Sequence, residues 1–225
     1  MEEKKAVLWD LGQVVVKVQP GAQIKAIGRA LNVSVQKLAE FIYLERAPGS
    51  SLTMWEEMET RGSACDIYEL FVKRFDPNLE TNYYDFVQAM NTGLIFPTEE
   101  TDELIAIMRR LKAAGVVQGI LSNIDAIHAA YFEFLMFRAR PELETIFPKP
   151  QRFYSQEIHA RKGKTPEAFL IACDRMGVKP ENAALIDDLP PNIRGVNSCG
   201  GKGILYTGPE GTLKKLMGFE FLPRY

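Results

Sequence analysis

The chain has 225 residues, of which 46% are hydrophobic and 25% are charged, and its formal net charge is −2. This length is enough to bury a substantial core, either as one large domain or as one domain with an insertion. Lys and Arg are scattered and no apolar run approaches the ~20 residues that span a bilayer, so we expect neither nucleic acid nor a membrane as a partner.

Residues 1–5 are charged and short of apolar side chains, so we expect no secretory signal. The three cysteines, Cys65, Cys173 and Cys199, lie far apart and lack the spacing of a metal site. An odd, unclustered set of cysteines is typical of reduced, buried thiols. We therefore predict a cytoplasmic protein.

The first apolar run, AVLW at residues 6–9, predicts a buried parallel strand because it is apolar on both faces. The stretch after it has helical periodicity instead, at residues 24–31, 35–44, 54–59, 67–75 and 83–90. Thr53 and Glu56 have the spacing of a capping box at the third of these helices. We predict a helical cap domain at residues 18–96, inserted into a core domain of residues 1–17 and 97–225. Such a cap is suited to act as a lid.

Strand and helix patterns alternate after residue 97. Apolar runs at residues 116–121, 183–186 and 203–206 predict further buried strands, and residues 101–114 and 166–176 predict helices. Gly177 is placed to end the second of these helices. The alternation predicts an α/β fold with a Rossmann-like parallel sheet and crossover helices. Residues 134–150 show no clear period, and we assign them to no element.

Polar residues follow three of the four predicted strands, at the point where each apolar run ends. They are Asp10, then Ser122 with Asn123, then Asp187 with Asp188. Each of these endings alone is explained as well by a turn or a helix cap. In an open parallel sheet, however, the carboxyl ends of the strands border one crevice, so we expect the three endings to meet there.

The acidic pair Asp187-Asp188 is the most informative of these endings. Carboxylates that face a third carboxylate raise one another's pKa unless a cation lies among them, and Mg²⁺ suits an all-oxygen site. An aspartate such as Asp10 is a nucleophile for phosphoryl groups. Phosphoryl transfer otherwise requires positioning and charge neutralisation, which Ser122 and a lysine from residues 161–166 would supply beside the start of a helix.

The order Asp, Ser, Lys, Asp-Asp resembles the four signature motifs of the haloacid dehalogenase-like (HAD) hydrolase superfamily, over essentially the whole chain. Residues 9–14, WDLGQV, are similar to the first motif, and residues 121–123, LSN, to the second. Residues 185–188, LIDD, together with Asn192, resemble the fourth. Ser122-Asn123 followed by His128 looks most like the small sugar-phosphatase branch with a helical cap, typified by bacterial α-glucose-1-phosphate phosphatase.

This resemblance implies a magnesium-dependent phosphatase that acts through an aspartyl-phosphate intermediate, with Asp10 as the catalytic nucleophile. The implied metal ligands are Asp10, the main-chain carbonyl of Gly12, Asp187 and Asp188. The implied phosphate-binding residues are Ser122, Asn123 and one of two lysines, Lys162 and Lys164. The implied partner is a small phosphorylated metabolite, and we expect a monomer or homodimer.

The sequence departs from the family pattern at two positions. Most phosphatases of the family carry an Asp two residues after the nucleophile as a general acid and base, which typically contributes 10²–10⁴-fold. Gly12 stands there in this chain. The usual lysine position falls on Gly163, between Lys162 and Lys164, and we favour Lys164 because it follows Gly163 directly before Thr165-Pro166.

Three alternatives remain open. A 2-haloacid dehalogenase would use the same aspartate and also lack an acid at Gly12, but it would not need the acidic pair to hold a metal. A catalytically degenerate member that binds a phosphorylated ligand or a protein partner is supported by Gly12. A receiver domain is disfavoured because its acidic pair comes early in the chain. We expect His128 to have a structural role and His159 to lie at the surface.

Overall fold

The computed structural model describes residues 3–46, 49–60, 62–76, 78 and 80–223. Within them, the strands are β1 (Ala6–Trp9), β2 (Lys17–Val18), β3 (Leu94–Ile95), β4 (Val117–Ser122), β5 (Arg152–Tyr154), β6 (Ala183–Asp187) and β7 (Lys202–Leu205). The helices of the first half are α1 (Pro20–Ala30), α2 (Val35–Tyr43), α3 (Met54–Met58), α4 (Ala64–Phe75), α5 (Tyr83–Met90) and α6 (Thr101–Ala113). Those of the second half are α7 (Ala126–Ala139), α8 (Leu143–Ile146), α9 (Ser155–Ile158), α10 (Glu167–Met176), α11 (Pro190–Ser198) and α12 (Pro209–Gly218), with short 3₁₀ turns at Lys149–Gln151 and Pro180–Asn182.

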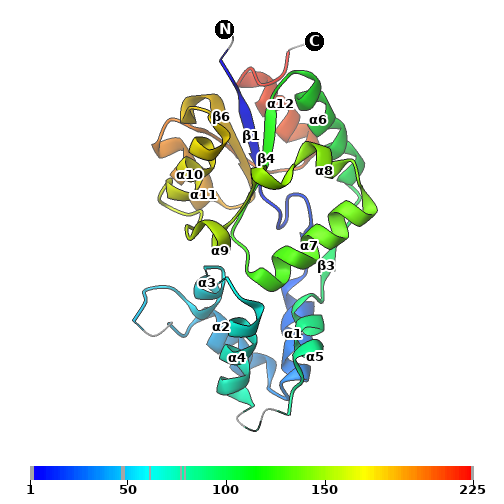
Figure 1. Cartoon of the computed structure of the whole chain (residues 1–225), viewed down its shortest axis with the longest axis vertical. Helices are drawn as coiled ribbons and strands as arrows, with labels where there is room; N and C mark the ends of the chain where they lie inside the picture. Colours follow the sequence, from blue (N-terminus) through cyan, green and yellow to red (C-terminus); the bar gives the residue numbers. More distant parts are fainter. Residues whose placement is uncertain (1–2, 47–48, 61, 77, 79, 224–225) are drawn as a thin grey trace.

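The core is a five-stranded parallel sheet with the strand order β5-β4-β1-β6-β7. Successive residues of β1 point to opposite faces of the sheet, so Val7 and Trp9 belong to one apolar cluster and Ala6 and Leu8 to another. Helices α6 and α12 cover the first face, and α10 and α11 cover the second (Figure 1). The predicted α/β fold with a Rossmann-like parallel sheet is confirmed.

The register of the sheet brings the carboxyl ends of its central strands together. Trp9 at the end of β1 lies opposite Ile120 in β4 and Ile186 in β6. The residues just beyond these positions, Asp10, Ser122 and Asp187, therefore emerge at the same edge of the sheet, as expected for polar residues that follow parallel strands.

Helices α1 to α5 form a separate bundle at one end of the molecule (Figure 1). The bundle has its own apolar cluster, centred on fully buried side chains such as Phe71 and Phe86. The capping box predicted at Thr53 and Glu56 is present at the start of α3. This arrangement is that of a helical cap on an α/β core, and the boundaries at residues 18 and 96 stay a prediction.

Two short strands connect the bundle to the core. Lys17 and Val18 of β2 pair with Ile95 and Leu94 of β3 in an antiparallel ladder. The chain therefore leaves the core and returns to it at neighbouring points, side by side.

Some elements differ from those that the sequence predicts. The unassigned residues 134–150 form the end of α7, all of α8 and a 3₁₀ turn, and they lead into β5, which was not predicted. Gly177 ends α10 with a left-handed φ of 63°, as predicted. Cys65 is exposed and only Cys173 is buried, so the prediction of three buried thiols is wrong for Cys65.

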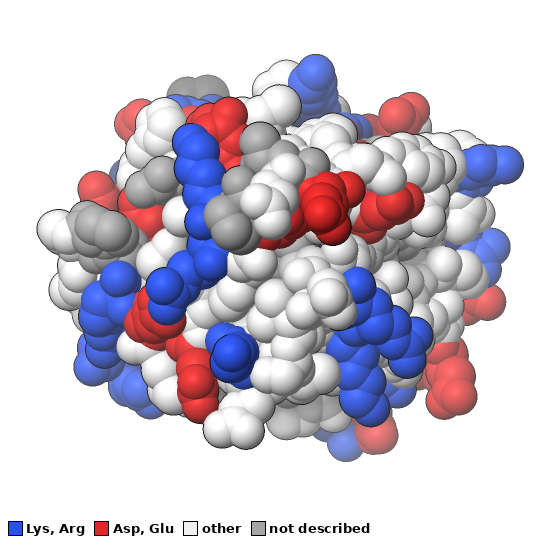
Figure 2. Space-filling model, turned by 90° about the horizontal axis from the view of Figure 1, so that it is seen from below, with Lys and Arg blue, Asp and Glu red and all other residues white. Residues whose placement is uncertain are grey.

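Acidic and basic side chains are both distributed over the face that the helical bundle presents, and neither sign covers it (Figure 2). In the described ranges, no helix combines the length and apolar character needed to cross a membrane.

Candidate active site

Asp10 lies in a buried position directly after β1, with 7% of the residue exposed. Its Oδ1 atom accepts hydrogen bonds from the backbone N–H of Leu11, at 2.8 Å, and from the hydroxyl of Ser122, at 2.9 Å. The same oxygen lies 2.7 Å from the ammonium nitrogen of Lys162. Strands β1 and β4 thus present a carboxylate and a hydroxyl to each other beside a lysine.

Lys162 connects this carboxylate to a second one. Its Nζ atom also lies 2.5 Å from Oδ2 of Asp187, at the end of β6. The lysine is buried, and burial alone would lower its pKa, but the carboxylates of Asp10 and Asp187 raise the pKa above its usual range. The ammonium group is therefore charged and held between two acidic residues.

The pKa of Asp10 is raised to about 7. Burial is the main cause, the ammonium of Lys162 opposes it, and the neighbouring Asp187 carboxylate adds to the rise. A cation bound beside these carboxylates would lower the pKa of Asp10 again.

Asp187 is fully buried and held by its own set of donors. The side-chain amide of Asn192 donates to both carboxylate oxygens at 2.9 Å, and the backbone N–H of Leu189 donates to Oδ1 at 2.8 Å. The adjacent Asp188 is half-buried, and burial together with the Asp187 carboxylate raises the pKa of Asp188. Asn192, in the first turn of α11, thus fixes the orientation of one member of the acidic pair.

Oxygen atoms of Asp10, Asp187 and Asp188 lie within 4.8 Å of one another, close enough to share one metal ion. Hard carboxylate oxygens are the ligands that Mg²⁺ prefers, and the carbonyl of Gly12 follows two residues after Asp10. The donor set therefore fits Mg²⁺.

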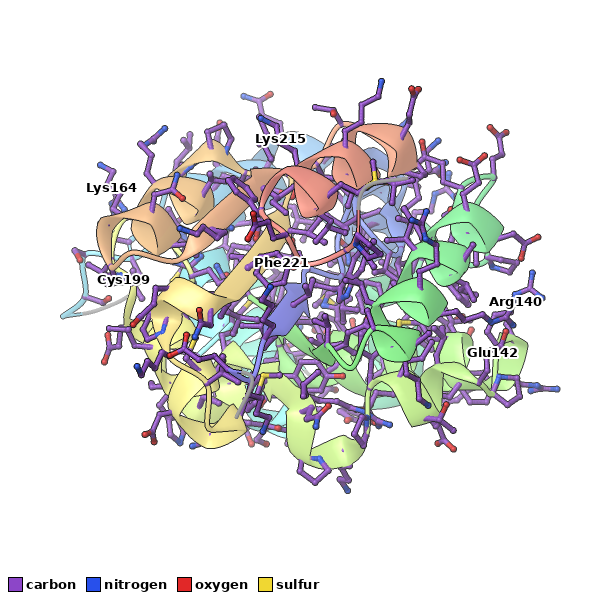
Figure 3. The ribbon with its side chains drawn as sticks, turned by 90° about the horizontal axis from the view of Figure 1, so that it is seen from above. Arg140, Glu142, Lys164, Cys199, Lys215 and Phe221 are labelled. Carbon is purple, nitrogen blue, oxygen red and sulfur yellow. The ribbon has the colours of Figure 1, made fainter. Side chains whose placement is uncertain are left out.

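The two candidate lysines lie in different places. Lys162 is in the cluster, whereas Lys164 is exposed, and Figure 3 shows it at the periphery of the molecule. This is the opposite of the preference that we drew from the sequence, and the physical reason is a pair of hydrogen bonds. The backbone N–H of Lys162 donates to Oδ1 of Asn123 at 2.7 Å, and Nδ2 of Asn123 donates to the Lys162 carbonyl at 3.0 Å. These bonds fix Lys162 next to the end of β4.

Arg161, directly before Lys162, connects the core to the helical bundle. Its guanidinium donates to Oε2 of Glu59 at 2.9 and 2.7 Å and to Oε1 of Glu56 at 3.2 Å, at the end and in the first turn of α3. Burial raises the pKa of Glu59, and the guanidinium opposes this rise. The other oxygen of Glu59 accepts a hydrogen bond from the indole N–H of Trp55 at 3.0 Å. The sequence did not point to Arg161 or Glu59, because neither belongs to a motif.

His128 and Asp125 form a second buried contact between the core and the bundle. Nδ1 of His128 pairs with the carboxylate of Asp125, which also caps the start of α7. Nε2 of His128 lies 2.9 Å from the carbonyl of Met90 in α5 and 2.5 Å from the amide of Gln23 in α1. This agrees with a structural role for His128, and His159 is exposed, as expected. Asp125 was not singled out, although an N-cap aspartate three residues before a histidine is a recognisable signal.

The chain is similar to known hydrolases in sequence and in structure. Residues 4–200 match the protein family described as haloacid dehalogenase-like hydrolase. No curated protein matches the chain in sequence.

Several solved structures share its fold. A HAD family enzyme from Bacteroides thetaiotaomicron, in complex with magnesium and inorganic phosphate, has a TM-score of 0.74 and 20% identity, over 91% of this chain and 95% of that chain. A predicted HAD-like family hydrolase from Porphyromonas gingivalis has a TM-score of 0.67 and 17% identity, over 90% of each chain. A HAD phosphatase from Thermococcus onnurineus has a TM-score of 0.56 and 20% identity, over 90% of this chain and 86% of that chain. At these identities the likeness shows the fold alone.

Proposed function

The chain belongs to the haloacid dehalogenase-like hydrolase family, and from this membership we propose that it hydrolyses a phosphate monoester of a small metabolite with Mg²⁺ at the carboxylate cluster. The observation that carries the proposal is the position of Lys162, whose ammonium lies between the carboxylates of Asp10 and Asp187. Phosphoryl transfer needs a nucleophile surrounded by positive charge, and this cluster provides one.

In the proposed reaction, Asp10 attacks the phosphorus atom and forms an aspartyl-phosphate, which water then hydrolyses. Oδ1 of Asp10 is held by Leu11, Ser122 and Lys162, so we assign the attack to Oδ2. Lys162 and the hydroxyl of Ser122 bind the phosphoryl oxygens, and Lys162 takes this role in preference to Lys164. Asn123 acts by holding the backbone of Lys162.

Mg²⁺ would be held by Asp10, Asp187, Asp188 and the carbonyl of Gly12, and when bound it would neutralise charge on the phosphoryl group. The magnesium and phosphate in the Bacteroides thetaiotaomicron enzyme support this choice of ion and ligand. Gly12 offers no proton to the leaving group, so turnover is slow with a poor leaving group. Residues 18–96 serve as a cap over the site. We place the protein in the cytoplasm.

The acidic pair favours phosphate hydrolysis over dehalogenation, since attack on carbon needs no metal-binding carboxylates. A sugar phosphate is one substrate compatible with this reaction. Gly12 is the observation that favours the second candidate, a degenerate member that binds a phosphorylated ligand without turning it over.

Release of inorganic phosphate from p-nitrophenyl phosphate tests the proposal, with Mg²⁺ and then with excess chelator. We expect turnover that the chelator abolishes and that Asp10→Asn lowers by about 10²-fold or more. Turnover that persists in chelator would contradict the metal-assisted reaction. If neither p-nitrophenyl phosphate nor any of a panel of phosphorylated metabolites is hydrolysed, the phosphatase proposal is wrong and the second candidate, binding of a phosphorylated ligand without turnover, replaces it.

A further inference from the structure

A cavity of about 170 Å³ lies between the helical bundle and the core, beside the carboxylate cluster. Gly12 and Ser122 line one side of it, and Trp55 and Glu59 of the bundle line another. The hydroxyl of Ser122 donates a hydrogen bond to Asp10. The cavity is therefore separated from the proposed nucleophile by the side chain of Ser122 alone. An ester whose phosphoryl group sits at Asp10 would place its leaving group here.

The volume limits the leaving group to a compact one. At about 170 Å³ it is below the ~300–1,000 Å³ typical of sites for drug-sized ligands. Much of the wall is apolar, with the rings of Trp55 and Phe132 and the side chains of Val18, Leu94 and Ile124. A short or single-ring alcohol fits within the cavity, whereas a nucleoside would extend beyond it.

The charges of the wall are already paired. The ionisable side chains among the described lining residues are Glu59, Asp125 and His128. Asp125 pairs with His128, whose second ring nitrogen lies against the carbonyl of Met90. Glu59 pairs with Arg161. Within the described wall, no cation is therefore left to face an anionic leaving group, and an unpaired charge in a buried site is strongly disfavoured.

Arg161 is a cation directly behind this wall, where Glu59 binds it. It does not line the cavity, but two of its nitrogens contact the carboxylate of Glu59, which does. Only 21% of the Arg161 side chain and 11% of the Glu59 side chain are exposed. Helix α3, which Glu59 follows, faces the α9 region of the core (Figure 1).

We propose that Glu59 is a specificity-determining residue: by pairing with Arg161 it denies a cation to the leaving-group cavity, so that the site selects compact phosphate esters of uncharged alcohols and rejects esters that carry a carboxylate. The inference rests on the proposed phosphatase function and adds the class of substrate to it. Glu59 acts on selectivity and takes no part in the chemical step.

Two substrates of nearly equal size test the selectivity. 2-Hydroxyethyl phosphate and 2-phosphoglycolate differ by a hydroxymethyl group in place of a carboxylate on the leaving group. We expect the kcat/KM of the wild type to be about tenfold or more higher for 2-hydroxyethyl phosphate. Equal values, or a preference for 2-phosphoglycolate, overturn the inference without any variant being made.

Glu59→Gln should change this ratio in a predictable direction. The glutamine keeps a hydrogen-bond acceptor for Trp55 but removes the negative charge that lies 2.7 Å from Arg161. Only Glu56, at 3.2 Å, then competes with a substrate carboxylate for the guanidinium. We expect the ratio to move toward 2-phosphoglycolate by about tenfold or more. In Glu59→Gln/Arg161→Gln the change should disappear, because the freed cation is gone.

Glu56→Gln is the matched control. Glu56 also contacts Arg161, at 3.2 Å, but it does not line the cavity, and a glutamine preserves the capping box with Thr53. Its ratio should stay near that of the wild type. A Glu59→Gln protein that hydrolyses both esters with the wild-type ratio overturns the inference and leaves the phosphatase proposal intact. Absence of turnover on every phosphate ester overturns both.

Discussion

The side-chain amide of Asn123 holds both backbone polar groups of Lys162, accepting from its N–H at 2.7 Å and donating to its carbonyl at 3.0 Å. One residue at the end of β4 thereby sets the position of a lysine almost forty residues away in the chain. The lysine side chain is then directed to Asp10 and Asp187.

Asn123→Ala should therefore lower kcat even though Lys162 is retained. A displacement of about 1 Å at a catalytic group can reduce the rate by about 10²-fold, and we expect a loss of 10- to 10²-fold. Asn123→Asp keeps the acceptor for the Lys162 N–H and should lose less. A kcat for Asn123→Ala equal to that of the wild type would show that the loop holds Lys162 without this amide.

Removal of each candidate lysine distinguishes the two assignments. Lys162→Met leaves two buried carboxylates without their shared cation, so we expect kcat to fall by about 10²-fold or more. Lys164→Met changes an exposed side chain and should remain within about twofold of the wild type. Steady-state kinetics on p-nitrophenyl phosphate with Mg²⁺ measures both. The reverse order of effects would restore the preference for Lys164.

Gly12→Asp should raise turnover by supplying the missing acid. A β-carbon at residue 12 would meet Val18 at 3.7 Å, an ordinary contact, and Gly12 does not have the positive φ that favours glycine. Proton donation typically contributes 10²–10⁴-fold, so we expect kcat to rise by about tenfold or more for an alkyl phosphate, which has a poor leaving group. Gly12→Asn is the control of equal size without an acid. If both variants have the same kcat, proton donation does not limit the reaction.

The buried pair of Asp125 and His128 predicts a pH dependence of stability. Burial alone would raise the pKa of Asp125 and lower that of His128, but their mutual attraction lowers the first below 3.8 and raises the second above 6.5. The Asp125 contribution is present above about pH 4 and is lost as the pH falls through its lowered pKa. The His128 contribution is present below about pH 6.5 and is lost as the pH rises through its raised pKa.

His128→Gln should therefore reduce the free energy of unfolding most between about pH 4 and 6.5, by on the order of 3 kcal/mol. Above the raised pKa of His128 the difference from the wild type should shrink. Urea unfolding at pH 5.5 and pH 9 measures this difference. A difference of the same size at both values would mean that the pair contributes through packing and neutral hydrogen bonds alone.

Much of the fold follows from local patterns that the sequence displays. The four apolar runs became β1, β4, β6 and β7. The first three are buried on both faces of the parallel sheet, whereas β7 is an edge strand in which Leu205 is exposed. β5, with three residues, is too short to show a period. Its pairing with β4 through Leu121 and Phe153 depends on tertiary contacts that no local pattern displays.

The candidate site was predictable where it depends on strand ends and not where it depends on a loop. Asp10, Ser122 and Asp187 meet because parallel strands end at one edge. Lys162 lies on a loop that follows His159. The backbone of His159 has a φ of 51°, and the turn that it makes cannot be predicted from the spacing of residues in the sequence. The amide of Asn123, directly after β4, holds the backbone of Lys162 and so decides which lysine is directed inward.

The pairing of Lys17 with Ile95 and of Val18 with Leu94 has a consequence for how the segment between them can be replaced. The segment between these residues starts and finishes at adjacent points. A helical bundle of different length could therefore replace it without moving the strands of the core sheet. Recombination could then exchange the whole segment, including Trp55 and Glu59, while the carboxylates of the core kept their positions. New substrate ranges would arise by modular exchange, with no change to the residues that perform the chemistry.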